Sequence, residues 1–461
     1  MKAARTLRKL QQPQALIGYV RQFLTPQVWK QAREAVPKKR RNPRWDLQPL
    51  VLVMMAMTWA AGDSQAEKFE KARGFYVACH QARKRPGKTL QGFQKALGRV
   101  PLCQLRALAA GVRQEIHARL GARRFVDGFE PMGCDGSRIE CPRTTELERR
   151  LGKAGKNDSA ATVWLTAFVH LPTGLLWSWR LGPGTAAEQV HLRFLLSTLS
   201  PQAMIVCDAA YMGFELVGAI LSSHRSFLFR MSSRVDLYTL EKVDLQDWTE
   251  GPVLYWPKFA QRKGLAPIQC RLIRVPAKAK AKTKGKAKSA VKRDVWLLTD
   301  VLDPARLSVA TAAKFYRWRW RNEGLFRTYK RTINKLKLSG RTVRQVHREA
   351  ELSLLATQIL LAHADLTLRS ETTAATGGPI ISPRKVLIEI RREIETVTKP
   401  KVKSYRERLT GCRADERKQT TPKATREWPR RKPHKPPKPP VLHTLTEEQK
   451  ILLNHHMGAV G

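Results

Sequence analysis

The spacing of apolar residues divides the chain into a helical first quarter and a later part that begins with strands. In residues 1 to about 125, apolar side chains recur every three or four positions, most clearly in 49–61 and 102–120, which predicts amphipathic helices. From about Phe125 the pattern changes to runs rich in β-branched and aromatic residues, as expected for consecutive strands. These runs lie at 126–142, 161–170 and 174–182.

Helices and strands alternate after this series. A helical stretch at 186–199 precedes the apolar run AMIVCD at 203–208, whose length and composition are typical of a buried parallel strand. A helix at 211–223 and a strand at 226–232 are predicted next. The predicted fold class is therefore α/β, with a mixed sheet flanked by helices.

The alternation is lost between about 232 and 292. This segment carries Trp248, Trp256 and the lysine-alternating run 277–293, and we expect a small β-rich insertion with a flexible basic loop. A strand at 294–300 and helices at 307–337 and 349–366 are predicted to follow.

The last part of the chain differs in composition. From about 396 it holds many prolines and basic residues, including the run RRKPHKPPKPP. We expect a tail of this composition not to pack a core, because it has little apolar surface to bury.

Net charge narrows the choice of partner. Lysine and arginine number 85 against 38 acidic residues, a formal net charge of +47. An excess this large repels itself in a compact state unless a polyanion shares it, so nucleic acid is the expected partner. A ribosomal or histone-like protein would have the same bias.

Cysteine usage and hydropathy indicate the compartment. The seven cysteines are scattered without a Cys-x-x-Cys pair, which argues against a zinc ribbon or a disulfide framework and fits a reducing cytoplasm. The most apolar early stretch, 47–61, is shorter than the roughly 20 residues that span a bilayer. We expect a soluble protein without a membrane partner.

One face of the predicted helix at 307–337 combines chemically distinct groups. Tyr316, Arg319, Glu323 and Lys330 fall within an arc of roughly 60° at about 100° per residue. A lone acid on a basic helix is often only the partner of an intrahelical ion pair. Beside phosphate-binding cations, however, a carboxylate suits a site that holds a divalent metal ion next to a DNA backbone.

Two further carboxylates are candidates for the same site. Asp135 lies within the first predicted strand, and Asp208 ends the apolar run 203–208, at the strand end where open α/β sheets place ligands. Each alone could equally be a turn residue or a helix cap. Together with Glu323 they could supply oxygen ligands to a pair of hard cations.

These motifs carry a family resemblance. The spacing of Tyr316, Arg319, Glu323 and Lys330 resembles the Tyr-(2)-Arg-(3)-Glu-(6)-Lys signature of the insertion-sequence transposases of family four. GCDGSRI resembles the family's first aspartate motif and CDAAYMGFEL its second, with Ala210 where many members carry glycine. The resemblance covers about residues 125–365.

The resemblance implies a ribonuclease H-like core in which Asp135, Asp208 and Glu323 are catalytic and bind two Mg²⁺ ions, for which Mn²⁺ may substitute. It also implies that Tyr316, Arg319 and Lys330 contact DNA phosphates near the cut. In relatives an aromatic residue of the insertion stacks on a flipped base, and Trp256 or Trp248 could do this here, although either could equally belong to the core. Flanking arginines, Arg327 among them, would partly line the DNA groove.

The expected function is cut-and-paste transposition of an insertion sequence by a homodimer that binds double-stranded DNA, both the terminal inverted repeats and the target. The expected location is the bacterial cytoplasm, associated with the nucleoid. Two alternatives stay open: a nuclease of the same fold without strand transfer, and an inactive or domesticated DNA-binding derivative. The expected domains are a helical DNA-binding domain (1–124), a core in two parts (125–231 and 293–366), the β-rich insertion (232–292) and a basic, partly disordered C-terminal extension (367–461).

Overall fold

A computed structural model describes the residues on which the following account rests. The described ranges are 15–36, 45–80, 85–152, 159–277, 294–369, 381–399, 403–412 and 438–458.

The N-terminal part is helical, as the apolar spacing predicted. Hydroxyl side chains begin several of its helices: Thr25, Ser64 and Thr89 each accept a hydrogen bond from a backbone N–H two or three residues into the helix that follows. The helices are α2 (Leu16–Phe23), α3 (Pro26–Glu34), α4 (Leu47–Trp59), α5 (Gln65–Cys79), α6 (Leu90–Arg99) and α7 (Leu102–Leu120).

Within the described residues, the strands form one ten-stranded sheet with the order β10-β6-β7-β8-β9-β5-β4-β1-β2-β3. The strands on one side are β1 (Glu130–Glu140), β2 (Thr162–His170), β3 (Leu175–Pro183), β4 (Ala203–Cys207) and β5 (Ser226–Arg230). Those on the other are β6 (Asp236–Thr239), β7 (Glu250–Tyr255), β8 (Ile268–Val275), β9 (Val295–Thr299) and β10 (Val441–Thr444).

Strand β1 lies between two kinds of neighbour. It pairs antiparallel with β2, which pairs antiparallel with β3, as the consecutive strand pattern predicted. On its other edge it pairs parallel with β4, and β4 pairs parallel with β5. All five residues of β4 are buried, in agreement with the apolar run that predicted a buried parallel strand.

The strands of the predicted insertion continue the same sheet. Strand β9 pairs antiparallel with β5 on one edge and with β8 on the other, so β9 joins the two halves. The lysine-rich loop predicted within the insertion lies largely outside the described residues, which stop at 277 and resume at 294.

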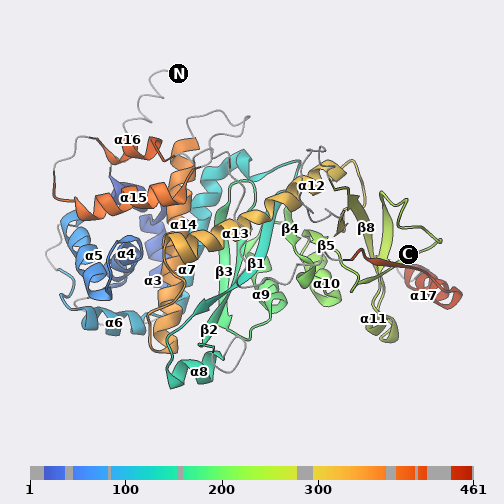
Figure 1. Cartoon of the computed structure of the whole chain (residues 1–461), viewed down its shortest axis with the longest axis horizontal. Helices are drawn as coiled ribbons and strands as arrows, with labels where there is room; N and C mark the ends of the chain where they lie inside the picture. The colour runs from blue at the N-terminus through green and yellow to red at the C-terminus, as the bar shows by residue number, and fades with distance from the viewer. Residues whose placement is uncertain are drawn as a thin grey trace, which may run out of the picture.

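Helices cover the sheet and its edges (Figure 1). After β1 these are α8 (Thr145–Leu151), α9 (Glu188–Leu195), α10 (Phe214–Ser222), α11 (Lys258–Arg262), α12 (Val309–Trp318) and α13 (Trp320–Arg327), with a π-helix at Thr328–Thr332. The predicted helix at 307–337 is thus broken at Arg319 and ends in a π-turn.

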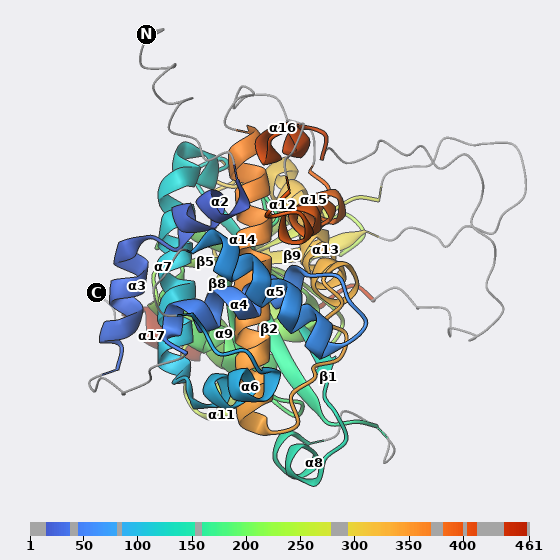
Figure 2. The same cartoon turned by 90° about the vertical axis from the view of Figure 1, so that its left-hand side faces the viewer.

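Helix α14 (Val343–Arg369) connects the N-terminal helices to the sheet. Figure 2 shows it running down the middle of the helical end, and it contacts α4, α7 and edge strand β3. Residues such as Leu352, Leu355 and Ile359 are almost fully buried. The amide of Gln358 donates hydrogen bonds to the carbonyls of Leu176 and Trp177, which fixes the helix against β3.

The expectation that the chain from about 396 packs no core is wrong for part of it. In α16 (Tyr405–Thr410), Tyr405 and Leu409 are buried with the N-terminal helices. Before it, α15 (Pro383–Glu395) packs on α4, α5 and α14. The abundant basic residues obscured the apolar positions, which recur at helical spacing. Strand β10 pairs with β6 and leads into α17 (Glu447–Gly458), whereas the run RRKPHKPPKPP lies mostly outside the described residues.

No helix among the described residues is both long enough and apolar enough to cross a membrane.

The packing of α15 predicts a contrast between two isoleucines of one helix. Ile390 is fully buried and Ile388 is 39% exposed. Ile390→Ala should lower the free energy of unfolding by about 2–5 kcal/mol because it leaves a cavity, while Ile388→Ala should change it by less than about 1 kcal/mol. Urea unfolding followed by circular dichroism measures both, and equal effects would contradict the placement of α15 in the core.

Candidate active site

The pairing of β1 with β4 brings two aspartates together. Gly133 lies opposite Val206 in the parallel register, and the same register continued two residues sets Asp135 beside Asp208. The thiols of Cys134 and Cys207, one residue earlier, interact on the opposite face. The sequence placed each aspartate on its own strand, and the structure makes the strands neighbours.

A guanidinium lies against both aspartates. Arg319, at the break between α12 and α13, is 7% exposed, and its Nη2 lies 3.9 Å from Oδ2 of Asp208. Its charge also acts on Asp135. The helix comes close to the strand here because Gly133 has no side chain: a Cβ at this position would lie 2.6 Å from Leu171 and 2.9 Å from Asn322.

Each aspartate also has a local role. Oδ1 of Asp135 accepts a hydrogen bond from the backbone N–H of Gly136 at 2.8 Å. Oδ1 of Asp208 accepts one from Ala209 at 2.7 Å and so caps a short 3-10 helix. The cap role that the sequence left open for Asp208 is therefore present, and it leaves Oδ2 directed toward Arg319.

Burial governs the ionisation of Asp135. It raises the pKa of this carboxyl to about 6, against the lowering effects of the Gly136 hydrogen bond and of Arg319. The charges of Glu188 and Asp208 add to the rise. A carboxylate that is this costly to ionise without further positive charge is suited to binding a cation.

Glu323 is not brought into contact with the aspartates. It is exposed on α13, one helical turn beyond Arg319, and it makes no hydrogen bond or ion pair with another described residue. Among the described residues, no three His, Cys, Asp or Glu side chains come close enough together to hold a metal ion. The structure therefore assembles two of the three predicted carboxylates.

The two aspartates supply part of the ligand set that a hard divalent cation requires. Asp135 and Asp208 supply the carboxylate oxygens that Mg²⁺ and Mn²⁺ prefer. Buried polar atoms beside them lack partners among the described residues: the Tyr316 hydroxyl, Nε of Arg319 and both amide atoms of Asn322. Such atoms are costly to bury unpaired, so they are available to a bound ligand or to water.

The other residues of the predicted signature, Tyr316 and Lys330, lie in different surroundings. Tyr316 is buried, and burial raises its pKa, an effect opposed by the charge of Arg319. Lys330 lies in the π-helix, where burial lowers its pKa and the charge of Glu140 opposes that effect. Glu140 is five residues from Asp135, about 16 Å along a strand. Arg327 is exposed on α13. Tyr316 and Arg319 thus lie beside Asp208, whereas Lys330 lies near Glu140, further along the strand.

Other predicted candidates lie in the core. Trp256 is 1% exposed and donates a hydrogen bond from Nε1 to the carbonyl of Leu265, which is the core position that the sequence left open. Trp248 is also buried and donates to Leu272. His170 and His191 are buried and hydrogen bonded to Thr173 and Thr166, respectively.

Two residues near the aspartates were missed from sequence. Glu188, at the start of α9, lies on the other face of the sheet from the Asp135 side chain. A Cβ at Gly136 would point to that other face, and it would be 2.9 Å from the Glu188 carboxylate. An acid in the first turn of a helix is normally explained by the helix dipole, so nothing marked it. Asn322 is fully buried beside Gly133 and directly precedes Glu323 in the chain, but it was not predicted as a site residue.

A mixed sheet with two carboxylates on adjoining parallel strands, beneath a basic helix, defines an α/β domain suited to phosphoryl-transfer chemistry. Residues 134–359 match the family model of the transposase DDE domain. Among solved structures, the chain is similar to the piggyBac transposase in its synaptic complex with hairpin DNA. That similarity has a TM-score of 0.44 at 11% identity and covers 90% of this chain and 88% of that chain. No curated protein matches the chain.

The raised pKa of Asp135 predicts a pH-dependent stability in metal-free protein. The folded state holds the Asp135 proton up to a pH of about 6, whereas the ordinary pKa of an aspartate, which applies to the unfolded chain, is 3.8. Stability should therefore fall as pH rises from about 4 to 6, by up to about 3 kcal/mol from this group. Asp135→Asn has no carboxyl to ionise at this position, so its stability should rise relative to that of wild type as the pH increases over this interval. Urea unfolding with chelator present measures the difference, and parallel pH profiles of the two proteins would contradict it.

Proposed function

We propose that the protein is a transposase that cuts and joins DNA in a metal-dependent reaction, by cut-and-paste transposition of an insertion sequence. The observation that carries the proposal is the adjacency of Asp135 and Asp208 on paired parallel strands under the basic helix that bears Arg319 and Glu323. It falls within residues 134–359, the transposase DDE domain.

We infer that the core is ribonuclease H-like. The order β3-β2-β1-β4-β5, with three antiparallel strands followed by two parallel ones, supports this assignment. In that core the first aspartate lies on the central strand and the second at the end of its parallel neighbour, as Asp135 and Asp208 do here.

Asp135, Asp208 and Glu323 are the proposed ligands of two Mg²⁺ or Mn²⁺ ions. Bound there, such ions would activate the attacking hydroxyl and stabilise the leaving oxygen. Arg319 has a second role: a DNA phosphate competes with Asp208 for its guanidinium. When the phosphate wins, Oδ2 of Asp208 becomes free to bind a cation. Glu323 then needs only a shift of α13 to approach the two aspartates.

Tyr316, Arg319, Lys330 and Arg327 are proposed DNA contacts. Arg319 and Tyr316 are close to the aspartates, so they would hold the phosphate next to the reacting one. Lys330 and the exposed Arg327 lie further along the helix and would hold the flanking backbone.

The proposed assembly is a homodimer with one subunit on each end of the element. Water would first nick the DNA, and the freed 3′-hydroxyl would attack the opposite strand to form a hairpin. A second water would open the hairpin and free the 3′-hydroxyl again, and this hydroxyl would attack the target. A nuclease that stops after the first step is the nearest rival, and joining of precut ends distinguishes the two.

An inactive DNA-binding derivative is the second candidate. It is favoured by one observation, the exposure of Glu323 apart from the aspartates. A protein of this kind would bind DNA but not Mn²⁺ at the two aspartates.

Replacing the third carboxylate separates binding from chemistry. Glu323→Gln should reduce cleavage of a plasmid carrying the element's ends by at least about 10³-fold, because a metal ligand is lost. Its affinity for DNA should be unchanged. Glu215→Gln, which removes an exposed carboxylate on α10, is the matched control and should cleave normally. Retained cleavage by Glu323→Gln would remove Glu323 from the site.

Metal binding provides a test without activity. Mn²⁺ should raise the melting temperature of wild type at pH 7, because a ligand that binds only the folded state stabilises it. Asp135→Asn and Asp208→Asn should show a much smaller rise. If Mn²⁺ stabilises all three proteins equally, the cation binds elsewhere, and the inactive derivative gains support.

A further inference from the structure

Asn322 is a polar residue on the face of α13 that packs against the sheet. The buried residues of α13 are Asn322, Leu325 and Phe326, and Asn322 is 0% exposed. Residues at this spacing share one face of a helix, and the buried face is normally apolar. An amide at position 322 therefore has a desolvation cost that an apolar side chain would not have.

The amide of Asn322 has no hydrogen-bond partner among the described residues. Both Nδ2 and Oδ1 are fully buried and unpaired there. Nδ2 is a donor and Oδ1 an acceptor, and a buried group of either kind destabilises the fold when its hydrogen bonds are not made. Packing alone does not account for an amide at this position.

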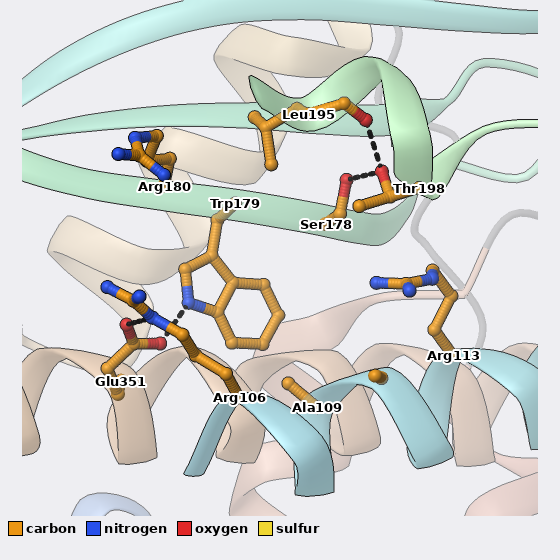
Figure 3. A pocket seen from close by; sticks show the side chains of 10 residues that line it. Arg106, Ala109, Arg113, Ser178, Trp179, Arg180, Leu195, Thr198 and Glu351 are labelled. Atoms are coloured by element: carbon orange, nitrogen blue, oxygen red, sulfur yellow. Dashed lines mark hydrogen bonds and ion pairs between the residues drawn. The ribbon is translucent and has the colours of Figure 1, made fainter. Parts of the chain in front are cut away.

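A buried polar group at another contact between helices and the sheet is paired within the protein. In the cavity between α7 and β3, the Glu351 carboxylate accepts a hydrogen bond from Nε1 of Trp179 at 2.6 Å (Figure 3). The same carboxylate lies 3.6 Å from Nε of Arg106. Donors have thus been brought to this buried acceptor, whereas no partner has been brought to Asn322.

Strand β1 leaves room for the Asn322 amide. A Cβ at Gly133 would lie 2.9 Å from both Nδ2 and Oδ1 of Asn322, so a larger residue at 133 would displace the amide. Alternate residues of a strand share a face, so Asn322 lies on the face that carries the Asp135 side chain. Gly133 and Asp135 are about 7 Å apart along the strand.

Asp135 has an oxygen that can accept a hydrogen bond on this face. Its Oδ1 accepts one from the backbone N–H of Gly136, and its Oδ2 has no hydrogen-bond partner among the described residues. Asn322 directly precedes Glu323, so a shift of α13 that carries Glu323 toward the aspartates carries the amide with it. An unpaired donor and an unpaired acceptor thus lie on the same face of β1.

We propose that Asn322 is a positioning residue of the aspartate site: its Nδ2 donates a hydrogen bond to Oδ2 of Asp135 and fixes the orientation in which this carboxylate binds a divalent cation. The inference rests on the proposed function, since it assumes that Asp135 is a metal ligand. A carboxylate has about four lone-pair sites, so Asp135 can accept this hydrogen bond and still bind a cation.

Replacing the amide by an apolar group separates a positioning role from a structural one. Asn322→Leu removes an unpaired buried polar group, so the melting temperature of the metal-free protein should be at least that of wild type. Its affinity for Mn²⁺ should fall by about 10–100-fold, because a ligand that loses its outer hydrogen bond is less well oriented.

Mn²⁺ binding is measured on the full chain at pH 7 from the electron paramagnetic resonance signal of free Mn²⁺. Asp135→Asn identifies the share of binding that belongs to the aspartates. Asn322→Ala decides if leucine prevents folding: its Mn²⁺ affinity should fall by the same factor as that of Asn322→Leu, although the cavity it leaves lowers its melting temperature.

The matched control is Gln358→Leu, which also removes a buried amide. The Gln358 amide is paired, since it donates hydrogen bonds to the carbonyls of Leu176 and Trp177. Its loss should lower the melting temperature and leave the Mn²⁺ affinity unchanged.

Two results would overturn the inference, and they differ in what they say of the proposed function. If Asn322→Leu and Asn322→Ala bind Mn²⁺ as tightly as wild type, the positioning role is wrong while the metal site stands. If wild type and Asp135→Asn bind Mn²⁺ equally, the aspartates hold no cation, and the positioning role fails together with the proposed metal site. Neither result depends on cleavage of DNA.

Discussion

The parallel pairing of β1 with β4 is the contact on which the rest of the site depends. A parallel pair needs a long connection, which here contains β2, β3 and α9. Helix α9 of that connection lies on the face opposite the Asp135 side chain, whereas its helix α8 packs with α13 and α14 on the other face. The pairing also brings two carboxylates from residues 135 and 208 into adjacent positions, where burial makes the ionised form of Asp135 costly.

Electrostatics explains why a basic helix lies over an acidic pair. Without DNA, Arg319 is the cation beside Asp208, and it limits the cost of two neighbouring carboxylates. The distance between the two charged groups, 3.9 Å, is long for an ion pair, and Asp208 is partly exposed. A phosphate can therefore replace Asp208 as the partner of Arg319 at little cost.

Helix α14 makes the N-terminal helices and the DDE domain one packed structure. It is buried against α4, α7, α15 and β3, and the Arg106–Glu351 pair ties α7 to it. A helical segment that the sequence analysis treated as a separate domain therefore packs directly on the edge of the sheet.

The local pattern of apolar and polar residues was enough to predict the helices and strands themselves. The apolar spacing predicted the N-terminal helices, the strands β1 to β5 and the α/β class, and residue spacing with the two aspartate motifs indicated the transposase domain. It was not enough for α16, whose two buried residues, Tyr405 and Leu409, are diluted by basic neighbours. Nor did it show that the strands of the insertion extend the core sheet, since pairing with β9 is a contact between distant segments.

Only the tertiary structure decided which predicted residues meet. Hydrophobicity and spacing act within a few residues and are encoded locally, whereas the proximity of Asp135 to Asp208 depends on strand order. The π-turn after Arg327 departs from the α-helical period that set Lys330 on the face of Tyr316 and Arg319, and Glu323 is exposed on α13. The burial of Trp256 likewise follows from packing between segments far apart in the chain, since Leu445 belongs to the same apolar cluster. Sequence thus determined the elements and the chemical groups they carry, and the packing of those elements determined the sites.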